Sequence, residues 1–511
     1  YKRQLQTCQR LGSFQDCLKN EFLQPPTYFP VVAESPSNQT IGCPAISPIN
    51  CHRDKYTQYL NQVEFYKQAL YSPDQLRLKI AFILHQIFQV SGSKIIQASY
   101  FSPYLNILKD NAFGNYRKLL EAITRNPAMG AYLDLVNNDK PSANGKTIPN
   151  ENFARELLQL FSIGEYWLND DGSLLLDINN KPIPTYDQET ILGFSRVFTG
   201  WTFSDHSLNT ASKFPNIANY ADPLVLFRDG KGYDLHHDKT TKTLLKLTVS
   251  ANPIILNANQ DGEVDLQEAL DTVFNHPNIA PFIGKQLIQH LVTSNPSPAY
   301  INRVSLAFNT GNSHGFGDGK RGDLRAVIAA VLLDDEARTP PTNSDYGLWR
   351  EPVMHILHAL RILNASSDGI LNSYSKSMGQ DLFYSPTVFN YYPHSYSINT
   401  SNLQSPEFGL SSDAQILARE NFIYLLVALK LNPDVNSSGT SFNLDGLAPY
   451  GADPVKMIYE INRYFMHGSL PFAMQNTILN VINTIPPSNL KLRVQTALYL
   501  TLTSGHYQVQ R

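Results

Sequence analysis

The sequence predicts a mainly α-helical protein with one large domain, a disulfide-bonded N-terminal arm and an irregular, β-containing insertion. Three observations lead to this prediction. Apolar residues recur at helical spacing through most of the 511 residues. All four cysteines lie near the N-terminus, and the irregular segment from about 165 to 260 includes residues 202–255, which have few helical periods and several Asp-Gly and Lys-Gly turns. We therefore divide the chain into an arm, residues 1–55, and a helical domain, residues 56–511, which includes the insertion.

The cysteines predict the compartment in which the protein works. Cys8, Cys17, Cys43 and Cys51 form an even set within one irregular segment, which indicates two disulfides. The simplest pairing is Cys8 with Cys17 and Cys43 with Cys51, although four cysteines permit three pairings. A zinc site is the alternative, but the spacings are longer than usual and no histidine pair accompanies them. Disulfides form in oxidising compartments, so we expect a secreted, periplasmic or cell-surface protein.

Composition narrows the class of partner. The net charge of −3 gives no broad basic field, which argues against nucleic acid and against an anionic membrane surface. Only 17% of residues are charged, whereas there are 27 Tyr and 26 Phe, so the surface suits an extracellular setting and contacts to sugars or proteins. No apolar run is long enough to predict a membrane span. The chain begins at Tyr1 without Met, as a mature exported protein or a truncated one would.

We take the stretch from Asn150 to Trp201 as the central motif of the sequence and interpret the other segments relative to it. It opens with NENFARELLQLFSIG, which predicts an amphipathic helix with Asn150 as N-cap and Gly164 as its end. The spacing of Glu151 and Arg155 suits an ion pair. The apolar side contains Phe153, Ala154, Leu157, Leu158, Leu160 and Phe161, and the polar side contains Glu151, Asn152, Arg155, Glu156 and Gln159. Such a face is usually solvated, so spacing alone predicts no chemistry.

A second helix is predicted to follow, together with short β elements. Residues 185–188 form a capping box, and the helix ends at Thr199-Gly200, directly before Trp201. Between the two helices, the turns in residues 167–184 predict a small hairpin. Residues 244–249 predict a strand within the insertion.

These motifs resemble a known family. NENFAREL, then a Tyr, a short helix and an FTGW ending are similar to the large, mostly bacterial, secreted family catalogued as a domain of unknown function and numbered eighteen hundred. The likeness covers about residues 75–430 and continues in FGNYRKLLEAITRNPAMGAYLD, HHDKTTKTLL, DLQEALDTVFNHPNIAPFIGKQLI, RGDLRAVIAAVLLD and SPTVFNYYP. The resemblance implies a mostly helical, exported protein, often encoded beside a sulfatase-like partner, with no agreed activity.

Histidines offer little evidence for a metal. The resembled family commonly reads W-H-x-H-F where this chain has Leu84-His85-Gln86-Ile87-Phe88, so the second histidine is replaced by Ile87. This departure counts against a site built on paired histidines, and we interpret His85 as a core residue. His355 and His358 lie in an otherwise apolar helix and are interpreted as packing residues.

Two further places resemble family positions that could support chemistry. Asp134 precedes the NENFAREL helix, where its carboxylate could face Glu151 or Arg155, or could serve only in a turn. In the insertion, the resemblance falls on His237, Asp238 and Lys242. Adjacent histidines point in different directions in an extended chain, so His237 and Asp238 are acid–base candidates or structural residues rather than metal ligands.

A calcium site is the sharpest metal prediction. Residues 257–268 match an EF-hand loop, with Gly262 at the sharp turn. Two departures weaken the match, because the first position is Asn rather than Asp and Pro253 replaces an entering helix. The alternative is an Asx-rich turn that caps the next helix. If calcium binds, we expect it to stabilise the fold through Asn257, Asn259, Asp261, Glu263, Asp265 and Glu268.

Three hypotheses about function follow. The preferred one is a hydrolase that acts on an extracellular polymer such as a glycan by carboxylate acid–base chemistry. The alternative is a non-enzymatic, calcium-stabilised surface or matrix protein, in which Glu151, Arg155, Glu156 and Arg196 form a closed ion-pair network. A redox or transition-metal enzyme is less favoured, because Ile87 stands where the resembled family has a second histidine. The catalytic candidates are Asp134, Glu151 and Glu156 as acid or base, Arg155 as their modulator, His237 and Asp238 from the insertion, and Trp201 as a sugar platform.

Overall fold

The computed structural model describes residues 12–44, 49–339, 345–398, 403–428, 431–432 and 438–510. Within these ranges helices predominate, and each strand is a two-residue segment paired antiparallel with one other. The mainly α fold class is therefore confirmed. The helices of the first part are α2 (Phe14–Leu23), α3 (Gln39–Gly42), α4 (Cys51–Tyr56), α5 (Tyr59–Tyr71), α6 (Gln75–Ile87), α7 (Ala98–Asn111), α8 (Tyr116–Thr124), α9 (Pro127–Tyr132), α10 (Asn152–Gln159), α11 (Gln188–Val197), α12 (Gly262–Asn275), α13 (Ile279–Leu291), α14 (Pro298–Thr310), α15 (Leu324–Leu333) and α16 (Asp335–Arg338).

The remaining elements complete the chain. The later helices are α17 (Pro352–Ile362), α18 (Asn372–Ser377), the 3-10 helix η1 (Pro406–Leu410), α19 (Asp413–Ala428), the 3-10 helix η2 (Ala448–Ala452), α20 (Pro454–Phe465), α21 (Phe472–Asn483), α22 (Leu490–Leu502) and α23 (Gly505–Gln508). The strand pairs are β1 (Trp201–Thr202) with β2 (Val225–Leu226), β3 (Lys242–Thr243) with β4 (Ile255–Leu256), β5 (Leu348–Trp349) with β8 (Val509–Gln510), and β6 (Ser366–Ser367) with β7 (Thr440–Ser441).

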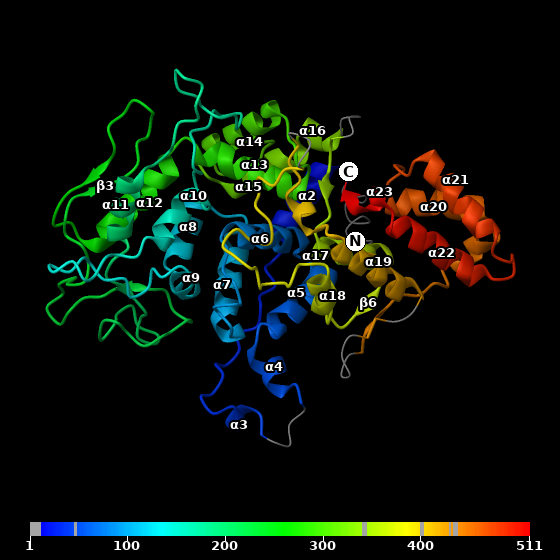
Figure 1. Cartoon of the computed structure of the whole chain (residues 1–511), viewed down its shortest axis with the longest axis horizontal. Helices are drawn as coiled ribbons and strands as arrows, with labels where there is room; N and C mark the ends of the chain where they lie inside the picture. The colour runs from blue at the N-terminus through cyan, green and yellow to red at the C-terminus, as the bar shows by residue number, and fades with distance from the viewer. Residues whose placement is uncertain are drawn as a thin grey trace.

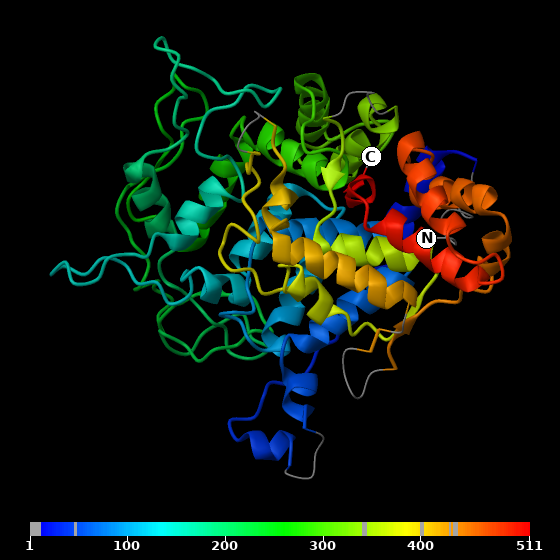
Figure 2. The ribbon, with the colours of Figure 1, turned by 45° about the vertical axis from the view of Figure 1, so that its right-hand side comes forward.

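The helices are arranged along the longest axis of the molecule. Figure 1 shows α11, α12 and the insertion at one end, α20, α21 and α22 at the other, and α5, α6, α7 and α17 between them. The segment with α3 and α4 projects from the middle in both views (Figure 1, Figure 2). No helix in the described residues is both long and apolar enough to cross a membrane.

A single large hydrophobic cluster connects the helices, and α6 lies within it. Its sequence QLRLKIAFILHQI is apolar on nearly all sides, which is typical of a buried helix, and Ile83 and Leu84 are fully buried. His85 is also buried, its Nδ1 lies 3.4 Å from the Tyr104 hydroxyl, and burial lowers the pKa of its ring to about 3. His85 is therefore a neutral core histidine, as expected.

The N-terminal segment is attached to the body at several points. Helix α2 packs against α6 and α15, and the Thr27 amide donates to the carboxylate of Asp74. Asp74 also forms a fully buried ion pair with Lys109 at 3.0 Å. The predicted Cys43–Cys51 disulfide is present. Cys17 is also disulfide-bonded, and its expected partner Cys8 lies outside the described residues.

Local structure near the NENFAREL motif differs slightly from the prediction. Helix α10 begins at Asn152, whose amide donates to the Asn150 side chain. Helix α11 begins at Gln188, and its N-cap is Asp187, which accepts from Thr190 N–H; the Thr185 hydroxyl instead donates to the Gly164 carbonyl. Residues 166–184 form two successive hairpins. The strand expected at 244–249 is not formed; the neighbouring strand β3 covers only Lys242–Thr243.

Candidate functional site

Asp134, Glu151 and Arg155 lie at the surface near the start of α10. The Asp134 carboxylate accepts from Lys94 at 2.7 Å and from Asn152 at 3.2 Å. Glu151 accepts from Arg155 at 2.9 Å and from Gln188 at 3.0 Å. Because the side chains of the Glu151–Arg155 pair are 27% and 41% exposed, solvent screens this pair and it contributes little to stability.

Glu156 has a different environment from its polar neighbours on α10. The residue is only 6% exposed, and its Oε2 has no hydrogen-bond partner among the described residues. Burial raises the pKa of the carboxyl to about 7, and the charge of Arg155 opposes this effect only in part. Glu156 forms no ion pair in the described part of the chain, while Arg196 lies 3.9 Å from Asp238, so the four residues do not form the closed network described above.

Trp201 is buried rather than displayed. It is 2% exposed, and the guanidinium of Arg125 lies 4.8 Å from its ring centroid. Arg125 in turn pairs with Glu121 and Glu263. A sugar platform needs an exposed ring face, so the structure corrects the expectation for Trp201. The ring instead packs in the core beneath a cation.

His237 joins three distant segments. Its Nδ1 lies 3.0 Å from the Thr199 carbonyl, and its Nε2 lies 2.9 Å from the carboxylate of Asp265 on α12. Lys242 approaches the same carboxylate at 2.7 Å, and all three side chains are essentially buried. A Cβ at Gly262 would lie 3.0 Å from the His237 ring, so glycine is required there for close packing. The predicted catalytic residue His237 is thus the centre of a buried structural cluster, which we call the His237 clasp.

The charge state of the clasp follows from its contacts. Burial raises the pKa of the Asp265 carboxyl, but hydrogen bonds from His237 and Lys242 and the charge of Lys242 outweigh it, so the pKa lies below its usual value. Asp238 is buried beside this cluster. Its amide donates to the Thr199 hydroxyl, and its carboxylate accepts from the Thr240 amide at 2.7 Å.

The expected calcium ligands have separate protein partners. Asp261 caps α12 and pairs with Arg228 at 2.8 Å, Glu263 pairs with Arg125 at 2.6 Å, and Asp265 belongs to the clasp. Glu268 accepts from Gln260. The backbone N–H groups of Asn257 and Asn259 donate to the Gln260 side chain and to the Lys239 carbonyl, respectively. No group of three or more His, Cys, Asp or Glu suited to a metal occurs among the residues that the structure describes. Calcium binding at this loop stays a prediction.

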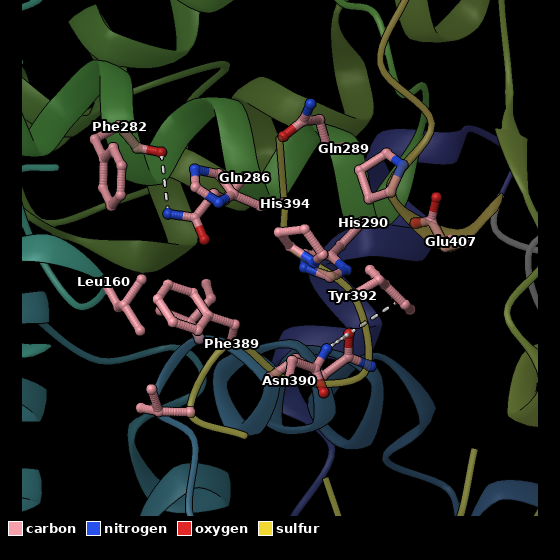
Figure 3. A pocket seen from close by; sticks show the side chains of 15 residues that line it. Leu160, Phe282, Gln286, Gln289, His290, Phe389, Asn390, Tyr392, His394 and Glu407 are labelled. Atoms are coloured by element: carbon pink, nitrogen blue, oxygen red, sulfur yellow. Dashed lines mark hydrogen bonds between the residues drawn. The ribbon is translucent and has the colours of Figure 1, made fainter. Parts of the chain in front are cut away.

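A pocket that the sequence analysis did not identify lies at the junction of α6, α13 and the segments 388–394 and 406–407. We call it the Glu407 pocket. Its cavity has a volume of about 40 Å³, room for a few water molecules or one small chemical group. In Figure 3, Glu407 lies on one side and Leu160 and Phe389 on the other. Leu160 is one helical turn beyond Glu156. The lining residues are Gln86, Ile87, Leu160, Phe282, Gln286, Gln289, His290, Val388, Phe389, Asn390, Tyr392, Pro393, His394, Pro406 and Glu407.

Glu351 lies directly behind one wall of this pocket. The residue is 4% exposed, and its Oε2 accepts from Gln380 at 2.7 Å, from Gln86 at 3.0 Å and from the Tyr392 hydroxyl at 3.1 Å. Its Oε1 faces the ammonium of Lys79 at 3.7 Å. A buried carboxylate needs such donors and an opposite charge, and Glu351 has both.

Glu407 has neither. It is 3% exposed, and its Oε2 has no hydrogen-bond partner in the described ranges. Burial raises the pKa of the Glu407 carboxyl to about 8, and the charge of Glu351 adds to this effect. Glu407 is therefore a protonated acid at neutral pH. The nearby carboxylate of Glu351, by contrast, is stabilised by hydrogen bonds.

The other polar residues of the pocket are uncharged at neutral pH. Burial lowers the pKa of His290 to about 3 and that of His394 to about 4. Glutamine, asparagine and tyrosine side chains supply hydrogen-bond donors and acceptors, and the ring of Phe282 packs edge-on to His394 with centroids 5.7 Å apart. A neutral, partly aromatic lining suits an uncharged polar ligand.

Sequence reasoning missed this site because its members are distant in the chain. Gln86 and Glu351 are 265 residues apart. One signal was present: Gln86 is an amide in the mostly apolar second half of α6, and a buried amide requires a partner. Glu351 precedes the Pro352 that begins α17, where an acidic residue is ordinarily read as a helix-start residue.

The fold and the pocket define a mainly α-helical protein that holds two unlike buried carboxyls beside a small neutral cavity. The family model described as a protein of unknown function (DUF1800) matches residues 3–509. The chain belongs to this family, which confirms the resemblance seen in the NENFAREL and FTGW motifs. No curated protein matches the chain, and no solved structure matches it.

Replacing Asp265 tests whether the His237 clasp is structural. Asp265→Asn removes the charge that compensates Lys242, so we expect a loss of about 3 kcal/mol or more in the free energy of unfolding, measured by urea denaturation at pH 7. The matched control is Asp271→Asn on the same helix, because the side chain of Asp271, which pairs with Arg117, is 58% exposed. This control should lose less than about 1 kcal/mol.

The difference in stability between wild type and Asp265→Asn depends on pH in a defined way. A carboxyl with a lowered pKa stabilises the fold above its ordinary value of 3.8, and this contribution is lost as the pH falls through the lower folded value. The gap between wild type and Asp265→Asn should therefore be constant near neutrality and narrow below about pH 4. Equal, small losses in both variants would show that the clasp has no structural role.

Proposed function

We propose that this protein is an acid–base enzyme, a hydrolase that acts on an uncharged polar substrate such as an extracellular glycan. One observation supports the proposal above others. Glu351 and Glu407 are buried carboxyls in unlike environments: the Oε2 of Glu351 accepts three hydrogen bonds, whereas the Oε2 of Glu407 accepts none from the described residues. Paired titratable groups with separated proton affinities are typical of acid–base sites.

The two carboxyls have complementary roles in this proposal. Glu407 donates its proton to the leaving-group oxygen as the bond to that oxygen breaks. A water molecule attacks the other side of the bond and releases a proton to Tyr392, whose hydroxyl already donates to Glu351 and passes its own proton to that carboxylate. The reaction consumes one water, and the transfer of one proton from Glu351 back to Glu407 restores the resting state.

The pocket indicates the substrate class. Its neutral donors and acceptors suit hydroxyl groups, and the 45% exposed Phe389 offers a ring face at the rim. Because the cavity holds only a small group, the larger part of a polymer would extend over the surface. Glu156, with its raised pKa and its place one turn before Leu160, is a second proton-exchanging group on that approach.

An extracellular setting supports the same proposal. The Cys43–Cys51 disulfide is consistent with an oxidising compartment, as secretion to the periplasm or cell surface provides. The alternative, a non-enzymatic surface protein, requires no protonated acid in a cavity. It is distinguished by the variants below.

Glu407→Gln tests the proposed acid. Because glutamine keeps the shape but cannot give up a proton, we expect the turnover rate on a responsive substrate to fall by about 10²-fold or more. The measurement is release of reducing ends from a panel of neutral glycans, with wild type compared at pH 6 to 9. Wild-type activity should fall above about pH 8 as Glu407 ionises.

Glu165→Gln is the matched control, since Glu165 is exposed and only accepts from Gln159. It should retain wild-type activity. A panel that gives no product would contradict the proposal and favour the non-enzymatic alternative. Full activity in Glu407→Gln would also contradict it, because another group would then supply the proton.

Glu407→Gln also has a predicted effect on the free energy of unfolding. Burial raises the pKa of Glu407 from 4.5 to about 8, so the folded state binds more protons than the unfolded state within that window. Wild-type stability therefore falls as the pH rises from about 4.5 to about 8, by at most about 1.4 kcal/mol per pH unit. Glu407→Gln should be more stable than wild type at pH 8 and lose that advantage near pH 5. Urea unfolding at both pH values measures this, and a gap that does not change with pH would refute it.

A further inference from the structure

A second cavity, of about 260 Å³, lies where α6 and α17 face each other. We call it the α6–α17 cavity. It differs from the Glu407 pocket because three basic side chains line it, namely Lys79, Arg350 and Arg361. Lys79 is shared between the two sites, since its ammonium also faces Glu351.

Arg361 is the residue on which the inference rests. Its Nε donates to the Ala69 carbonyl at 3.0 Å, and its Nη2 donates to that carbonyl and to Gln75. Its Nη1 has no protein partner among the described residues, and Arg361 forms no ion pair within them. Burial lowers the pKa of the guanidinium to about 10, so it remains charged at neutral pH.

Arg361 is a partly buried cation, and no carboxylate of the described residues lies within ion-pair distance of it. Charges removed from water require an opposite charge or a full set of hydrogen bonds. The charge of Glu21 acts on Arg361 only at a distance, and Glu351 already compensates Lys79. An anion in the cavity would supply the missing charge, and the planar guanidinium suits a carboxylate.

The remaining wall restricts the kind of anion. Phe65, Phe82, Leu291, Met354 and Leu357 give the cavity a mainly apolar surface. A strongly hydrated inorganic ion would leave that surface unfilled, whereas an organic acid buries its body there.

We propose that the α6–α17 cavity binds a small organic acid, with its carboxylate beside Arg361 and Lys79 and its alkyl or aryl body against the apolar wall. The site needs no catalysis at Glu407. Its test is therefore independent of the hydrolase proposal.

Calorimetric titration of the full chain with octanoate is the test. Octanol has the same body without charge, and acetate has the charge without the body; each should bind at least ten-fold more weakly than octanoate. Arg361→Gln should weaken octanoate binding at least ten-fold, whereas Arg361→Lys should retain part of it. Arg463→Gln is the control, because Arg463 is a half-exposed residue paired with Glu460 outside the cavity, and it should bind as wild type does.

Two results would overturn the proposal. The first is that the wild-type protein does not bind octanoate, or binds octanol equally well. The other is a folded Arg361→Gln variant with unchanged affinity. If Arg361→Gln fails to fold by circular dichroism, the wild-type comparison of octanoate with octanol decides by itself.

Discussion

The hydrogen-bonded carboxylate of Glu351 is the interaction on which the centre of the structure depends. A charge buried to this extent is stable only with its donors in place. Those donors come from α6 through Gln86 and Lys79, and from the segment after α18 through Gln380 and Tyr392. The carboxylate therefore fixes three parts of the chain relative to one another.

The same arrangement explains the state of Glu407. Because Gln86, Gln380 and Tyr392 already donate to Glu351, an ionised Glu407 would face a like charge while its Oε2 accepts no hydrogen bond from the described residues. Glu407 retains its proton instead. A fold that keeps such a group gives up stability at neutral pH, which is common where a side chain serves a reaction.

The residues of the most recognisable motifs mostly have structural roles. His237, Asp265 and the FTGW turn form the clasp, in which Gly200 and Gly262 allow close approach. Trp201 packs beneath Arg125. Glu156 is the member of the NENFAREL motif whose environment suits proton exchange.

Local patterns predicted the elements well and the site poorly. Periodicity predicted α6, α10 and α12, because burial of an apolar face follows directly from spacing. The N-cap of α11 was misplaced by two residues because Thr185 bonds to Gly164 across the hairpins.

The spacing of residues 257–268 fits an EF-hand. In the structure, however, Asp261, Glu263 and Asp265 form ion pairs with two arginines and with Lys242. The Glu407 pocket depends on contacts between residues hundreds of positions apart, and no local pattern encodes them.

The most direct test of the account is the ionisation state of Glu407 itself. Infrared difference spectra between wild type and Glu407→Gln, recorded from pH 5 to 10, isolate the carbonyl stretch of its protonated carboxyl. The account predicts that this band is present at pH 7 and disappears with a midpoint near pH 8. Absence of the band at pH 7 would mean that Glu407 is ionised there, and the acid–base pair at the centre of the account would not exist.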